Sequence, residues 1–140
     1  AQAVNILLIR SFSELDSTIE YLRSKSCKFS VLQCTTKYPT QAEDVGLNVL
    51  NELKTRYQVE VGLSDHSGTI YPCLAAASLG ATIFEVHVVF NKDMFGPDSK
   101  SSLEFIQMKQ LVEGINFIEK SLLNIVDKSD NSNLKILLIN

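Results

Sequence analysis

The stretch Val59-Glu60-Val61-Gly62-Leu63-Ser64-Asp65-His66 decides the fold, because a short apolar run leads directly into a group of polar side chains. Residues 81–90 are a second mainly apolar run, and they contain the polar side chains of Glu85-Val86-His87. These two stretches hold the only two histidines of the chain. Such runs are typical of buried strands in a parallel sheet, where ligands bind beyond the carboxyl ends of the strands. We therefore expect His66 and His87 to lie together at one edge of a sheet.

Strand-like and helix-like segments alternate on both sides of these stretches. The patterns predict strands at 4–9, 29–34, 59–63 and 81–90, and helices at 13–25, 42–57, 69–79 and 102–123. Repeated strand–helix units favour a parallel sheet with right-handed crossovers. The predicted fold class is α/β, with four consecutive β-α units that make half of a TIM (β/α)8 barrel, since a whole barrel needs about 250 residues. An open four-stranded sheet of flavodoxin type is the alternative.

The predicted half-barrel occupies residues 1–124, and residues 125–140 form a tail that is loosely structured or a partial strand. The chain begins with alanine and enters an apolar run almost at once, which suggests a piece of a longer or processed chain. A half-barrel leaves two parallel sheet edges without a partner strand. We therefore expect a homo-oligomer, or a barrel that another chain completes.

Composition excludes several classes of partner. The net charge is −3, and acidic and basic residues are interspersed, so neither nucleic acid nor an anionic membrane surface is an expected partner. The longest low-charge stretch, residues 67–84, is too short and too polar for a membrane span. No secretory signal pattern opens the chain. Three cysteines without CxxC spacing predict reduced thiols in a cytoplasmic protein.

Four motifs follow one another along the chain. They are LQCTTKYPT at 32–40 with AEDV and LN behind it, VGLSDH at 61–66, the alanine-rich run 75–81 leading into EVH at 85–87, and MFGPD at 94–98 with SSLE at 101–104. Together, and in this order, they resemble the sialic acid synthase family over about residues 29–123. The resemblance is to the C-terminal half of that family's synthase barrel.

The resemblance implies an activity. Members of the family condense phosphoenolpyruvate with an N-acylmannosamine-type sugar to give a nine-carbon α-keto acid, in a (β/α)8 barrel that a small antifreeze-like domain usually follows. By resemblance the chain is therefore part of an N-acetylneuraminate synthase-like transferase that forms a carbon–carbon bond. The N-terminal half of the barrel, which carries the residues that recognise the sugar, has no counterpart here. We therefore expect the 140-residue piece to be inactive alone.

Site residues follow from the resemblance position by position. It assigns two ligands of a divalent metal, Mn²⁺ or Mg²⁺, two contacts to phosphoenolpyruvate, and two further catalytic residues near the sugar; these are His66 and His87, Ser64 and Thr36, and Tyr38 and Asp98. Two imidazoles on neighbouring strands can hold one such metal with coordination positions left for substrate. Glu85 shares strand parity with His87 and should face the same way in a supporting role.

Other interpretations of the same residues remain open. A histidine at a strand end is more often a hydrogen-bonded structural residue than a metal ligand. Ser64-Asp65-His66 does not indicate a hydrolase, because a catalytic triad is assembled from separate segments and no Gly-x-Ser-x-Gly motif is present. The chain could also be a non-catalytic module whose open sheet edges bind another chain. A synthase of legionaminic or pseudaminic acid is a third possibility.

Overall fold

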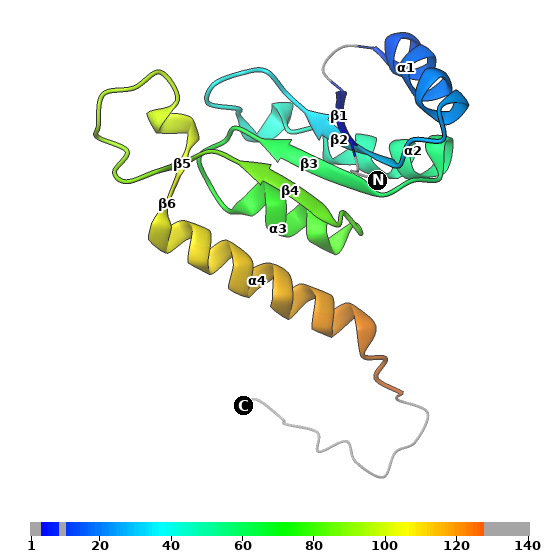
Figure 1. The fold of residues 1–140 in the computed structure, drawn as a ribbon. Coiled ribbons are helices and arrows are strands. Elements are labelled where there is room, and N and C mark those ends of the chain that lie inside the picture. Colours follow the sequence, from blue (N-terminus) through cyan, green and yellow to red (C-terminus); the bar gives the residue numbers. More distant parts are fainter. Residues whose placement is uncertain (1–3, 9–10, 128–140) are drawn as a thin grey trace.

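The computed structural model describes residues 4–8 and 11–127. Its main sheet contains four parallel strands in sequence order, β1 (Val4–Leu8), β2 (Phe29–Cys34), β3 (Val61–Asp65) and β4 (Ile83–Val86). A helix follows each strand along the chain: α1 (Phe12–Ser24), α2 (Leu47–Tyr57), α3 (Tyr71–Ser78) and α4 (Phe105–Leu123). Figure 1 shows the curled sheet with its helices. This is the predicted half-barrel of four β-α units.

The alternation of side chains along the strands separates a helix-covered face from a concave face. Val31 and Val61 pack into one apolar cluster with α1 and α2, and Leu63 packs into a second with α2, α3 and α4. Side chains alternate between the two faces of a strand. Ser64 on β3 and Glu85 on β4, which are partners in the strand register, therefore face the concave side.

Gly62 allows β3 and β4 to approach each other closely. A Cβ atom at this position would lie 2.3 Å from the carbonyl oxygen of Ile83. No side chain can occupy that space without moving one strand away from the other. The distance between the carboxyl ends of these two strands therefore depends on this glycine.

Two predicted elements are interrupted in the structure. The predicted helix at 42–57 was wrong in its first part, which forms a short 3₁₀ turn at Ala42–Asp44, and α2 starts only at Leu47. Gly46 lies between them with φ 72°, a left-handed conformation that an α-helix cannot include. The predicted strand at 81–90 is also divided, into β4 and the short β5 (Val88–Val89).

The end of the predicted strand at 81–90 pairs outside the main sheet. β5 makes a separate parallel pair with β6 (Leu103–Glu104), so the helix predicted from residue 102 begins at Phe105. The Glu104 carboxylate and the Gln107 side chain form a capping box at this start. Ile9, the last residue of the first predicted strand, lies outside the described residues. The remaining differences between predicted and observed elements are shifts of one or two residues at their ends.

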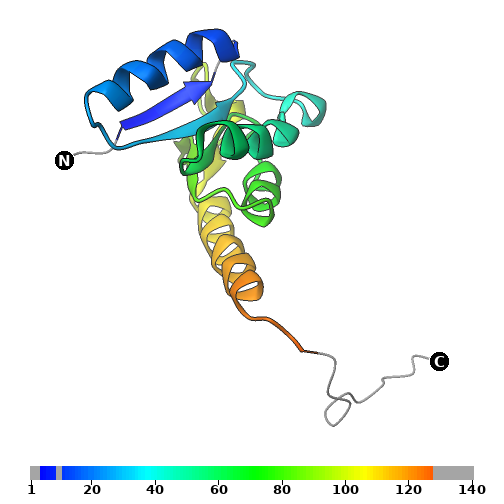
Figure 2. The same cartoon turned by 90° about the vertical axis from the view of Figure 1, so that its right-hand side faces the viewer.

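Helix α4 extends away from the rest of the protein. It packs on α3 through its first half and then projects beyond the sheet, as Figure 2 shows. Within residues 4–8 and 11–127, no helix is long and apolar enough to cross a membrane. Most of the predicted tail, residues 128–140, lies outside the described residues.

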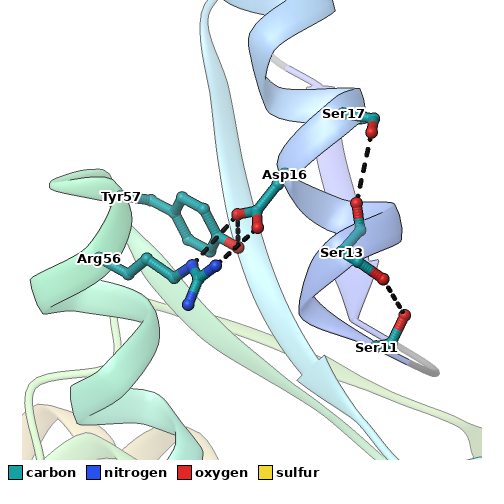
Figure 3. Close-up of polar contacts among 6 residues, drawn as sticks. All are labelled: Ser11, Ser13, Asp16, Ser17, Arg56 and Tyr57. Atoms are coloured by element: carbon teal, nitrogen blue, oxygen red, sulfur yellow. Dashed lines mark hydrogen bonds and ion pairs between the residues drawn. The ribbon is translucent and has the colours of Figure 1, made fainter.

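Helices α1 and α2 are joined by polar contacts on the outside of the half-barrel (Figure 3). The Arg56 guanidinium donates two hydrogen bonds to the Asp16 carboxylate, at 3.1 and 2.6 Å, and the Tyr57 hydroxyl donates a third at 2.7 Å. These hydrogen bonds, from Arg56 first, hold the pKa of Asp16 below its usual value. Burial, and then the bond to Asp16, raises the pKa of Tyr57 to about 12.

Candidate functional site

The two histidines meet at the carboxyl ends of neighbouring strands. His66 directly follows β3 and His87 directly follows β4, which pairs with it in parallel. Their ring centroids are 5.1 Å apart and the ring planes are at 78° to each other. The parallel register of the two strands, together with their close approach at Gly62, brings the imidazoles to this common point.

His66 is buried and its orientation is fixed. Only 4% of its surface is exposed, and its Nδ1 lies 3.0 Å from the backbone carbonyl oxygen of Thr35. A carbonyl oxygen can only accept, so Nδ1 carries a proton and donates. In the neutral imidazole Nε2 then carries the lone pair. This atom faces the concave side, 3.0 Å from the Tyr38 hydroxyl.

Tyr38 lies against both histidines. The centroid of its ring is 4.3 Å from that of His66 and 5.9 Å from that of His87. Burial raises the pKa of the Tyr38 hydroxyl, and the nearby acidic groups Cys34, Asp98 and Glu85 add to this effect. The hydroxyl therefore keeps its proton near neutral pH and can donate it to Nε2 of the neutral His66 ring.

Asp98 approaches His87 from the loop between β5 and β6. Its Oδ2 lies 3.8 Å from Nδ1 of His87, and both side chains are in contact with solvent. They line an open hollow of about 540 Å³ together with residues 95–97 and 99 and parts of β5. Asp98 therefore forms a wall of the site that solvent and small molecules can reach.

Ser64 and Glu85 form the lower part of the site, in the direction of the middle of the sheet. The Ser64 hydroxyl is buried and donates a hydrogen bond of 2.7 Å to Oε1 of Glu85. Strand parity predicted that Glu85 faces the site, and the structure confirms this position. Sequence reasoning gave it only a supporting role and did not predict its bond to Ser64.

Thr36 is exposed in the loop after β2. The structure instead brings its neighbour Thr35 to the site, through the carbonyl oxygen that orients His66. A residue that acts through its main chain leaves no signal in side-chain type, so sequence reasoning missed it. The same loop is held against the end of β3 by the Thr40 amide, which donates to the carbonyl of His66 at 3.0 Å.

The donor set fits a divalent metal in part. A histidine whose Nδ1–H donates to a backbone carbonyl, with a free Nε2, is the usual arrangement of a metal ligand. His66 has this arrangement, with the difference that the Tyr38 hydroxyl now contacts Nε2. No group of three or more His, Cys, Asp or Glu side chains in the described part of the chain could hold a metal. The chain therefore offers at most two imidazole ligands, and other ligands would have to come from substrate, water or another chain.

Comparisons with known proteins agree with this geometry. The chain is 34% identical over 128 residues to the N,N'-diacetyllegionaminic acid synthase of Campylobacter jejuni, which covers 89% of this chain and 38% of the relative. It is 44% identical over 92 residues to the pseudaminic acid synthase of the same species, which covers 65% of this chain and 26% of the relative. The chain thus spans well under half of the length of these relatives.

A solved structure has the same fold. It is the N-acetylneuraminic acid synthetase of Leptospira borgpetersenii in complex with citrate, with a TM-score of 0.83 and 28% sequence identity. The match covers 93% of this chain and 46% of that one, as expected for half of a synthase barrel. The NeuB family matches residues 9–127, which include every residue of the site. The four motifs, the half-barrel and these matches agree, and the chain belongs to the NeuB family.

Proposed function

We propose that this chain supplies half of the active site of a synthase that joins phosphoenolpyruvate to an N-acylmannosamine-type sugar. The observation that supports it best is the meeting of His66, His87, Tyr38 and Asp98 above β3 and β4. All four lie within the matched family region, and the names of the relatives describe synthases of nonulosonic acids. The relatives differ in their sugar product, so legionaminic, pseudaminic and N-acetylneuraminic acid remain candidate products.

In the proposed reaction the enol carbon of phosphoenolpyruvate bonds to the aldehyde carbon of the open-chain sugar. Water then adds at the former enol-phosphate carbon, and inorganic phosphate leaves. A bound Mn²⁺ or Mg²⁺ would supply a Lewis acid for the aldehyde oxygen. His66 and His87 are the side chains proposed to hold it.

Each site residue has a proposed task, and for Thr36, which lies exposed in the loop after β2, the task rests on the family resemblance alone. Ser64 and Thr36 can donate hydrogen bonds to phosphate or carboxylate oxygens of phosphoenolpyruvate. Ser64 has one proton to donate and now gives it to Glu85, so it must turn from Glu85 to bind substrate. Tyr38 and Asp98 border the open hollow and are placed to contact hydroxyl groups of the sugar.

Tyr38 also controls access to His66. The lone pair on Nε2 cannot accept the tyrosine proton and bind a cation at the same time. The hydroxyl must therefore leave Nε2 when His66 binds a metal, and it is then free to donate to the substrate.

The three cysteines are unpaired, which supports a reducing, cytoplasmic compartment for this chemistry.

A Mn²⁺ titration followed by calorimetry tests the proposed site. We expect heat of binding from the full chain, and its loss in His66→Ala and in His87→Ala. Asp16→Asn is a matched control, because it changes one polar side chain on the outer side of the half-barrel and leaves both imidazoles unchanged. Identical titration curves for all four proteins would remove the metal assignment.

A second function is favoured by a different observation. Within the described residues β1 pairs only with β2, and β4 pairs only with β3, so the four-stranded sheet has two free edges. A chain with free parallel edges can act as an assembly module that pairs with another chain. Sedimentation at micromolar concentration separates the two functions, because a stable monomer would contradict edge pairing and leave the metal titration unaffected.

A further inference from the structure

Strand β4 has one edge without a partner strand in the described part of the chain. The Val31 amide donates to the carbonyl of Glu60 at 3.0 Å, and alternate residues of a parallel strand bond to opposite neighbours, so the even-numbered residues 60–64 bond towards β2. The residues of β4 opposite Gly62 and Ser64, which are Ile83 and Glu85, therefore bond towards β3. Phe84 and Val86 direct their backbone groups to the free edge. β6 pairs with β5 beyond the end of β4 and leaves Phe84 and Val86 uncovered.

Helix α4 extends past this uncovered edge. Leu111 in its first half is fully buried, whereas Leu122 and Leu123 in its last turn are 60% and 74% exposed. Between this last turn and the start of β4 lies an apolar cavity of about 270 Å³, which Phe84 and Ile115 also line. A helix of a β/α barrel packs over its own strand and the next one. α4 therefore has one strand beneath it and space for a second.

The chain itself contains a segment that suits this space. Residues 134–139 have the sequence Leu-Lys-Ile-Leu-Leu-Ile, and their last four residues are the same as Ile6-Leu7-Leu8-Ile9. Ile6 to Leu8 already form part of the parallel strand β1. The sequence Ile-Leu-Leu thus already forms part of a parallel strand in this fold.

The connection between α4 and this segment also has the right position and length. The last turn of α4 lines the same cavity as Ala81 and Thr82, at the amino end of β4, where a strand parallel to β4 would have to begin. Residues 124–133 lie between the helix and the segment and include Asp127, Lys128, Asp130 and three asparagines. A polar connection of this length can return the chain to the sheet through a right-handed crossover.

We propose that residues 134–139 pair in parallel with the free edge of β4 and place their apolar side chains under the last turns of α4. A tethered segment competes well with a second copy of the chain, because its effective concentration is on the order of millimolar. The segment would occupy the edge that a completing barrel half needs. Completion of the barrel would therefore require its displacement.

Amide hydrogen exchange tests the pairing residue by residue. In the full chain we expect the amides of Phe84 and Val86 to exchange about tenfold more slowly than in Ile136→Asp/Leu138→Asp, since a charged segment cannot enter the apolar cavity. The amides of Ile83 and Glu85 bond towards β3 and report whether the sheet stays folded. Asn131→Asp/Asn133→Asp is the matched control, because it adds the same charge to the polar connection.

Four results would overturn the proposal. Fast exchange of Phe84 and Val86 in the unchanged chain would show that the edge is uncovered. Protection that persists in Ile136→Asp/Leu138→Asp would show that something else covers it, and protection that increases with protein concentration would identify a second copy. A second test needs no variant: nuclear Overhauser contacts should join the methyl groups of Leu122 to those of residues 134–139, and their absence contradicts the pairing.

Discussion

At the scale of single residues, the hydrogen bond between Tyr38 and His66 must break before His66 can bind the proposed metal. We expect Tyr38→Phe to bind Mn²⁺ several-fold more tightly than the unchanged chain, because metal binding no longer breaks a hydrogen bond worth about 1 kcal/mol. The calorimetric titration measures this change in affinity. Weaker binding would instead show that the hydroxyl helps to hold the ion or its water.

The identity of the site residues could be predicted from the sequence only where side-chain type carries the signal. His66 and His87 were found because each follows an apolar run of strand length, and strand parity added Glu85. The partners of these groups could not be found in this way. The carbonyl of Thr35 acts through the main chain, and the bond from Ser64 to Glu85 depends on the register between β3 and β4, which is a tertiary property.

At the scale of the elements, Gly62 sets the distance between the two strands that carry the histidines. We expect Gly62→Ala to lower the free energy of unfolding by about 2 kcal/mol or more, since the new Cβ meets backbone of β4 and not a flexible side chain. Chemical denaturation measures the loss. The same variant should weaken Mn²⁺ binding, because it moves His87 away from His66.

Gly114→Ala is the matched control for this change. Its new Cβ would meet only the end of the Leu74 side chain, which can move, and alanine is favoured over glycine inside a helix by about 1 kcal/mol. We therefore expect a stability close to that of the unchanged chain and unaltered Mn²⁺ binding. Equal destabilisation by both substitutions would contradict the special role of the contact between β3 and β4.

The contact between α1 and α2 gives the protein a pH-dependent stability. The folded pKa of Asp16 lies below its unfolded value, so this carboxylate stabilises the fold at neutral pH and stops doing so as the pH falls below about 4. We expect Asp16→Asn to lower the melting temperature at pH 7, and to lower it by a progressively smaller amount as the pH falls from about 4 towards the lowered pKa of the folded state. Ser17→Ala on the same helix is the control, since Ser17 contacts only the Ser13 carbonyl among the residues drawn in Figure 3.

The ends of the helices and strands show where the local sequence pattern and the tertiary structure disagree. β2 and the order of all four β-α units were predicted correctly, because buried strands and amphipathic helices have different periods. The break at Gly46 was missed because glycine within a helical pattern is often tolerated, whereas here it has a positive φ that an α-helix cannot include. β5 and β6 were missed because two-residue strands have no period to detect.

At the scale of the whole molecule, the half-barrel explains why side chains line one side of the site and leave the other side open. The segments after β2, β3 and β4 and the loop between β5 and β6 provide the four side chains Tyr38, His66, His87 and Asp98. Nothing in the described residues forms the opposite side of the concave face. The relatives are longer than this chain by more than twofold. Substrate enclosure, which excludes water and orients the reacting carbons, would therefore require further barrel strands.

We accordingly expect no detectable condensation of phosphoenolpyruvate with N-acetylmannosamine by the 140-residue chain, although the same chain binds Mn²⁺. The two expectations differ because metal binding needs only groups that this half brings together, whereas turnover needs two substrates held in reacting geometry. Release of inorganic phosphate, compared with a full-length synthase as a positive control, measures turnover. Robust phosphate release with formation of a nonulosonic acid would show that four β-α units, alone or as assembled copies, already enclose a complete site.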